Sequence, residues 1–149
     1  MKLKCLSVTA LFLCVAMIAA TTVTIQSQML GVLEQRIGAL GTAIMALVIG
    51  GVVGIVLFLI VRPDLGAWRE APWWAWLAGA AGFVVVLGIS FAVPRIGITP
   101  TLSVVIAVQL VVGVVLEQTG WLESADRPLD VLRVLGLVMV AGGAWLVVR

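Results

Sequence analysis

Long apolar runs separated by short polar segments dominate this sequence. Crossing the hydrocarbon core of a bilayer takes ~20 apolar residues in a helix, so runs of that length with charge only at their ends predict membrane spans. The chain holds five such runs, at residues 3–29, 37–61, 73–93, 96–116 and 131–148. The pattern predicts an all-α integral membrane protein with five transmembrane helices, forming a single transmembrane domain over residues 1–149.

The segments between these runs differ in length and charge. Residues 31–36 and 94–95 are short, so each is expected to form a turn between antiparallel helices. Residues 62–72 and 117–130 are longer and carry most of the charge, so we expect them in water or among lipid headgroups. Both are too short to fold as a soluble domain.

The N-terminal run resembles a secretory signal peptide in outline, because Lys2 and Lys4 precede an apolar stretch. That stretch, residues 5–25, is too long for a typical signal core and leads directly into another span. We therefore expect it to remain in the protein as the first helix.

Composition excludes several classes of protein. With 63% hydrophobic and 11% charged residues and a mean hydropathy of +1.27, the chain has too little charge to cover a soluble enzyme. It has no His, and Cys5 and Cys14 lie about 13 Å apart on opposite faces of a helix, so neither a metal site nor any other cofactor is expected. A net charge of +2 gives no sign of a nucleic-acid partner.

The distribution of basic residues predicts the orientation in the inner (plasma) membrane. With the N-terminus cytoplasmic and the C-terminus outside, six basic residues face the cytoplasm and three face outward, as the positive-inside rule favours. The inner residues are Lys2, Lys4, Arg62, Arg69, Arg127 and Arg133, and the outer ones are Arg36, Arg95 and Arg149.

Tryptophan is concentrated near the ends of the spans. Trp73, Trp74 and Trp76 open the third span, and Trp68 and Trp121 also lie near span ends. Amphipathic rings favour headgroup depth, so we interpret them as an interfacial belt, with a ligand-binding aromatic cage as the alternative. Trp145 differs because it falls inside the fifth span, where it is a candidate for substrate contact.

Polar side chains inside the spans are functional candidates because each needs a partner there. Gln109, near the centre of the fourth span, is the first candidate for substrate binding; a helix–helix hydrogen bond is the equal alternative. Thr22 and Gln26 lie one turn apart in the first span, where they either contact substrate or mark the interfacial end of a long helix. Glu117, at the end of the fourth span, is a possible coupling carboxylate for proton-driven transport.

Small residues recur through every span after the first. Their spacing allows close approach of helix backbones, within the chain or with a second subunit. The glycines expected at helix-packing contacts are Gly50, Gly54, Gly79, Gly82 and Gly113.

Several short motifs together resemble the small, five-helix YdcZ-like branch of the drug/metabolite transporter superfamily. They are residues 36–43 (RIGALGTA), 72–76 (PWWAW) with Gly79 and Gly82, and 94–97 (PRIG), followed by Gln109, Glu117 and residues 118–120 (QTG). Two positions depart from the family pattern: Leu30 stands where Asn is common, and Val108 where Gly usually precedes Gln109.

The resemblance implies one half of a ten-helix inverted-repeat transporter. A single half has no complementary wall for a pathway, so a homodimer or a paired homologous five-helix chain, possibly antiparallel, is expected. The implied function is a secondary transporter subunit that moves a small organic solute or lipid-like molecule by alternating access. A non-transporting accessory or assembly subunit of a larger membrane complex is the alternative, and no enzyme activity is expected. The substrate, coupling ion and direction of transport stay open.

Overall fold

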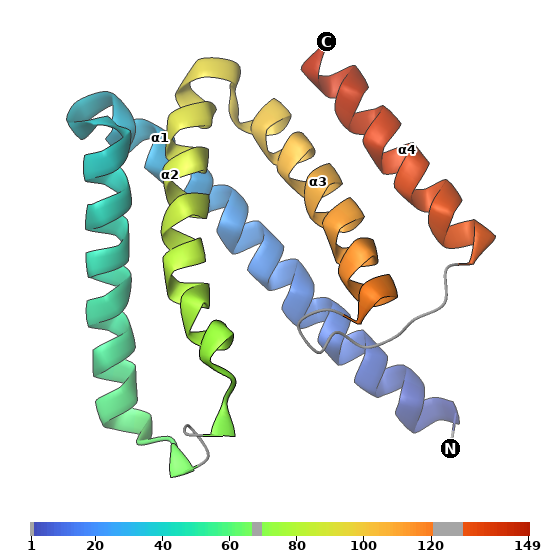
Figure 1. Ribbon diagram of the computed structural model, residues 1–149, viewed down its shortest axis with the longest axis horizontal. Coiled ribbons are helices and arrows are strands. Elements are labelled where there is room, and N and C mark those ends of the chain that lie inside the picture. Colours follow the sequence, from blue (N-terminus) through green and yellow to red (C-terminus); the bar gives the residue numbers. More distant parts are fainter. Residues whose placement is uncertain (1, 67–69, 121–129) are drawn as a thin grey trace. The chain divides into compact units, whose positions relative to one another are not determined.

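The structure is a computed structural model that describes residues 2–66, 70–120 and 130–149, with side chains from Thr9 onward. In chain order it contains α1 (Lys2–Val61), the 3₁₀ helix η2 (Trp73–Leu77), α2 (Ala78–Ile96), α3 (Ile98–Thr119) and α4 (Val131–Val148) (Figure 1). The described residues form helices and their connections, which confirms the all-α prediction. Four helical segments are apolar and long enough to cross a membrane, against the five expected, because the first two expected spans both lie in α1.

A glycine interrupts α1 between those two spans. Gly38 has φ 76° and ψ 162°, a conformation essentially restricted to glycine, and helix continues on both sides of it. The expected turn over residues 31–36 was wrong, because that segment is helical and the break comes two residues later. Good helix formers such as Leu33, Glu34 and Gln35 carry the helix forward until a residue without a side chain allows the reversal (Figure 1).

A second glycine ends α2 in nearly the same conformation. Gly97 has φ 88° and ψ 160°, and α3 begins at the next residue. The turn expected at residues 94–95 was wrong, since α2 continues through Pro94 as far as Ile96. Both breaks fall at the glycine of an Arg-Ile-Gly tripeptide, at residues 36–38 and 95–97. A buried threonine, Thr42 or Thr101, stands four residues after each glycine. The Thr101 hydroxyl donates to the Gly97 carbonyl, four residues before it, at 2.7 Å.

The chain divides into two compact units, Met1–Arg95 and Ile96–Arg149. In the first, α1 and α2 are in direct contact at Gly31. A Cβ built on Gly31 would lie 2.6 Å from Val93 Cγ1, so only a glycine fits against that side chain. Among the described residues of this unit, the buried side chains are Ser27, Leu30, Thr42, Ala43, Ile89, Ser90 and Val93.

The buried hydroxyl groups of this unit are mostly bonded to their own helix. Ser27 donates to the Val23 carbonyl at 2.7 Å, and Ser90 donates to the Val86 carbonyl at 2.6 Å. Hydroxyls bonded in this way let small polar residues pack like alanine at a close helix contact. Thr42 is the exception, since its fully buried Oγ1 has no hydrogen-bond partner among the described residues.

In the second unit, α3 and α4 lie side by side (Figure 1). Ala144 of α4 is buried, whereas most large apolar side chains of both helices are exposed. Exposed apolar surface of this extent suits a helix pair in lipid, where hydrocarbon surrounds the side chains that water would surround in a soluble protein.

The glycines expected at packing contacts are open within the chain. A Cβ built on Gly50, Gly54, Gly79, Gly82 or Gly113 would meet no atom within 4 Å. Within its own compact unit, none of the five therefore makes a tight contact with another described helix. Their role in contacts with a second chain stays a prediction.

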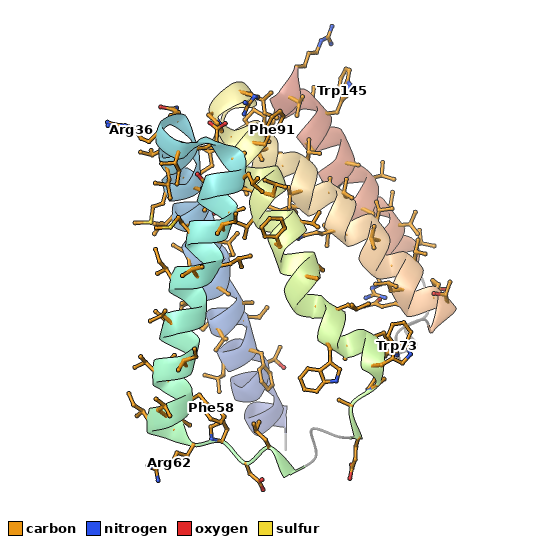
Figure 2. All side chains as sticks on the ribbon, turned by 60° about the vertical axis from the view of Figure 1, so that its left-hand side comes forward. Arg36, Phe58, Arg62, Trp73, Phe91 and Trp145 are labelled. Atoms are coloured by element: carbon orange, nitrogen blue, oxygen red, sulfur yellow. The ribbon has the colours of Figure 1, made fainter. Side chains whose placement is uncertain are left out.

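The tryptophan-rich entry to the third span forms η2 rather than the first turn of α2. Trp73 and Trp76 are exposed and Trp74 is partly buried, as Figure 2 illustrates for Trp73. The interfacial belt stays a prediction. Several residues of the sequence-based predictions lie outside the described part of the chain, namely Trp68, Arg69, Trp121 and Arg127, as do the side chains of Lys2, Cys5 and Lys4.

Candidate functional site

A groove between α3 and α4 gathers the polar residues of the second unit. It has a volume of about 360 Å³, and it contains three residues that the sequence singled out, Gln109, Gly113 and Glu117. These residues are four apart, so they follow one face of α3. The other residues that line the groove are Leu110, Val114, Arg133, Gly136, Leu137 and Val140.

An ion pair closes one end of this groove. Arg133 Nη2 lies 3.1 Å from Glu117 Oε2, and the two side chains are 38% and 30% exposed. Glu117 Oε2 is itself buried and makes no hydrogen bond among the described residues, so charge rather than a directed hydrogen bond holds the pair. The groove thus offers one cation and one anion, side by side and within reach of a ligand.

The rest of the groove is apolar apart from one amide. Gln109 lies two helical turns before Glu117, about 12 Å along α3 at 1.5 Å per residue. The structure shows no hydrogen-bond partner for the Gln109 amide among the described residues. An amide between apolar walls and without a partner among the described residues is available to a ligand.

The polar residues of the first span occupy a different unit from this groove. Thr22 donates its hydroxyl to the Ile18 carbonyl at 2.9 Å, and Thr24 likewise bonds Ala20 at 3.0 Å. The threonine hydroxyls are therefore used by their own helix rather than paired with the amide one turn later. Gln26 and Thr22 are both exposed and stay candidates for substrate contact.

Trp145 does not line the groove, although it belongs to α4. It is 60% exposed, and the Arg149 guanidinium lies 5.2 Å from its ring centroid (Figure 2). A cation over an indole ring near a helix end is typical of an interfacial anchor. Its predicted contact with substrate stays a prediction.

A second ion pair, which the sequence did not predict, joins α1 to α2. Arg95 Nη1 lies 3.1 Å from Glu34 Oε1 and also donates to the Phe91 carbonyl. The guanidinium carbon lies 3.7 Å from the centroid of the Phe91 ring, and the Glu34 side chain is only 11% exposed. The contact at Gly31 brings these two charges together, and nothing in the sequence marks that contact.

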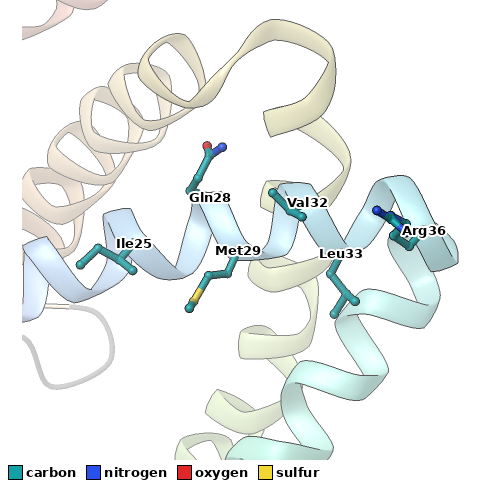
Figure 3. A pocket seen from close by; sticks show the side chains of 6 residues that line it. All are labelled: Ile25, Gln28, Met29, Val32, Leu33 and Arg36. Carbon is teal, nitrogen blue, oxygen red and sulfur yellow. The ribbon is translucent and has the colours of Figure 1, made fainter.

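The first part of α1 also presents an unpartnered face. Its residues recur every one to three positions along the helix, so they share one side of it, and they border about 690 Å³ of open space (Figure 3). They are Ile25, Gln28, Met29, Val32, Leu33 and Arg36. Because a single helix supplies every lining residue, this face is a surface that lipid or another helix can cover rather than an enclosed binding site.

Comparison with known proteins gives a family match over most of the chain. The sequence profile described as "Putative inner membrane exporter, YdcZ" matches residues 11–146. The chain is also 28% identical, over 117 residues, to the inner membrane protein YdcZ of Escherichia coli (strain K12); the alignment covers 72% of this chain and 76% of that protein. No solved structure matches the chain.

Proposed function

The chain belongs to the YdcZ family, a small branch of the drug/metabolite transporter superfamily, and on that basis we propose that it is a subunit of a small secondary transporter. It is a multi-pass inner membrane protein. The proposed activity is movement of an organic solute or a lipid-like molecule across that membrane by alternating access.

The α3–α4 groove is the observation that carries this proposal. It combines an amide without an internal partner and two reachable charges with apolar walls, in helices long enough to cross a membrane. Polar and ionisable groups in such helices are costly in lipid, so they are candidates for a solute pathway. Gln109 is the proposed solute contact, and Glu117 is also the candidate for the coupling carboxylate.

The length of α1 supports five crossings rather than four. Sixty helical residues would span about 90 Å, three times the ~30 Å hydrocarbon core. The break at Gly38 divides α1 into two limbs, each of which is long enough to cross once. With α2, α3 and α4 the chain crosses five times, so its termini lie on opposite sides, the N-terminus in the cytoplasm by the basic-residue bias.

A five-crossing chain is half of the proposed ten-helix transporter. The groove has walls from only two helices of the second unit, and the open glycines Gly50, Gly54, Gly79 and Gly82 leave room for the backbone of another helix. A second copy, or a homologous chain of opposite orientation, would supply the missing wall. Antiparallel pairing would reproduce the inverted repeats of larger transporters.

A comparison of two glutamine substitutions tests the proposal. Purified protein in proteoliposomes is screened against a library of organic solutes, with internal content read by mass spectrometry. Gln109→Leu should slow uptake of the transported solute roughly fivefold to tenfold, the effect of losing one hydrogen bond of about 1–1.5 kcal/mol. Gln28→Leu, the same change at a residue of α1 that does not line the groove, should leave uptake unchanged.

Monodisperse elution of both variants in detergent is the control for folding. Loss of folded protein in Gln109→Leu alone would instead identify the amide as a structural contact between helices. If the unsubstituted protein moves no solute above empty vesicles and is recovered in a larger membrane complex, the accessory-subunit function replaces the transporter.

A further inference from the structure

The charges at the end of the α3–α4 groove occupy positions that their own helices disfavour. Glu117 is in the last turn of α3 and Arg133 is in the first turn of α4. The helix dipole is unfavourable to an anion at a C-terminus and to a cation at an N-terminus. Helix stability therefore does not account for either residue, and the pair calls for another explanation.

Both side chains of the pair are partly exposed, although the paired oxygen, Glu117 Oε2, is itself buried. About a third of each side chain is exposed, and the two charged atoms approach at 3.1 Å without hydrogen-bond geometry between them. In the α1–α2 pair, by comparison, Arg95 is 48% exposed but Glu34 is only 11% exposed, and Glu34 accepts a hydrogen bond from Arg95. Because the anion as well as the cation of the groove pair is partly exposed, a ligand in the groove can reach both side chains.

Charge balance restricts which ligands can make that exchange. A ligand with a single charge would pair with Glu117 or with Arg133 and leave the other without a counter-charge beside apolar walls, which is unfavourable. A ligand that carries both charges on neighbouring atoms would satisfy both residues at once. The two side chains are close enough for one headgroup to bridge them.

The remaining walls define the rest of the ligand. From the ion pair the groove continues between Val114 and Leu137 toward Gln109, about 12 Å along α3. Gly113 and Gly136 leave space on the two facing helices. An alkyl chain fits this apolar length, and a polar group at its far end would meet the Gln109 amide.

We propose that the α3–α4 groove binds a zwitterionic amphiphile, with its ammonium group at Glu117, its acid group at Arg133 and its tail along the helices toward Gln109. This inference rests on the proposed transport function for its biological role, but binding itself is measurable without transport. A free zwitterionic solute and the headgroup of a zwitterionic lipid share this chemistry.

The test compares three probes with the same six-carbon tail. Hexylphosphocholine is zwitterionic, hexyltrimethylammonium is cationic and hexyl phosphate is anionic. Calorimetric titration into the full chain in uncharged dodecyl maltoside micelles, with empty micelles as blank, should show the zwitterion binding roughly tenfold or more tightly than either other probe. Equal affinities, or tighter binding of a singly charged probe, would overturn the inference.

Two double variants test whether the preference for the zwitterion depends on the ion pair. Glu117→Gln combined with Arg133→Gln removes both charges and should abolish the preference for the zwitterion. Glu117→Arg combined with Arg133→Glu keeps an ion pair in reversed order and should retain the preference for the zwitterion. This variant distinguishes an effect of lost charge from an effect of lost fold. Unchanged preference in the first variant, or loss of preference in a folded second variant, would contradict the assignment.

Phosphatidylethanolamine added to the micelles distinguishes the two sources of ligand. Displacement of hexylphosphocholine would identify the ligand as a lipid headgroup, and absence of displacement would identify it as a free solute. Zwitterion binding by a protein that transports nothing would keep this inference and end the transporter proposal. Transport of a solute without zwitterion binding would keep the transporter proposal and end this inference.

Discussion

Gly31 determines how closely two helices of the first unit approach. Because a Cβ at this position would lie 2.6 Å from Val93 Cγ1, Gly31→Ala should destabilise the protein by about 1–3 kcal/mol. Gly143→Ala is the matched control, since its Cβ would meet nothing within 4 Å and alanine favours helix by up to ~1 kcal/mol. Thermal unfolding in detergent should show a lower Tm for the first variant and an equal or higher Tm for the second.

A compensating substitution tests whether the contact itself is the cause. Val93→Ala removes the Cγ1 methyl group with which a Cβ at residue 31 would collide. In the Val93→Ala background, Gly31→Ala should therefore lower the stability much less than it does in the unsubstituted protein. If Gly31→Ala is as stable as Gly143→Ala, α1 and α2 do not meet at this residue.

At the scale of the elements, α1 is the helix whose number of membrane crossings is least obvious from its apolar character. Its 60 residues are longer than a single crossing requires, and Gly38 is the one described residue within it that departs from helical φ and ψ. Two crossings place the segment around Gly38 and the segment after Val61 on opposite sides of the membrane.

Reporter fusions measure this directly. Alkaline phosphatase, which is active outside the cytoplasm, should be active when fused after Leu40 or after Arg149 and inactive when fused after Leu65. A fluorescent protein that folds only in the cytoplasm should give the opposite results at the same positions. Matching signals after Leu40 and Leu65 would mean that α1 does not cross twice.

At the scale of the whole molecule, the question is which partner covers the exposed helices. Ala81 and Gly88 of α2 are both exposed, lie seven residues apart on one face, and stand at equal distances from the middle of the span Trp73–Ile96. In an antiparallel dimer across this face, Ala81 of one chain would meet Gly88 of the other. In a parallel dimer, each residue would meet its own copy.

Cysteine cross-linking between two differently tagged chains separates these arrangements. In a Cys5→Ser, Cys14→Ser background, Ala81→Cys in one chain should cross-link with Gly88→Cys in the other more efficiently than either variant with itself. Cross-links only between like positions would establish parallel pairing. A protein that transports as a monomer would exclude the dimer altogether.

The sequence by itself determined the class of the protein and part of its groove. Long apolar runs indicate membrane spans directly, because a helix that crosses the hydrocarbon needs a minimum length and few charges, and both features are visible in the sequence. The spacing of Gln109, Gly113 and Glu117 likewise fixes one face of a helix, since helical periodicity is local. Family membership was also visible from short motifs along the chain.

Tertiary structure alone decided which groups meet across helices. Arg133 opposite Glu117, Arg95 opposite Glu34 and Val93 against Gly31 depend on the register between neighbouring helices, which no local pattern encodes. The positions of the turns belong to the same category, because residues 31–36 and 94–95 are polar enough for a turn, yet the helix continues. The breaks fall at Gly38 and Gly97, where the backbone adopts a conformation that only a residue without Cβ enters at little cost.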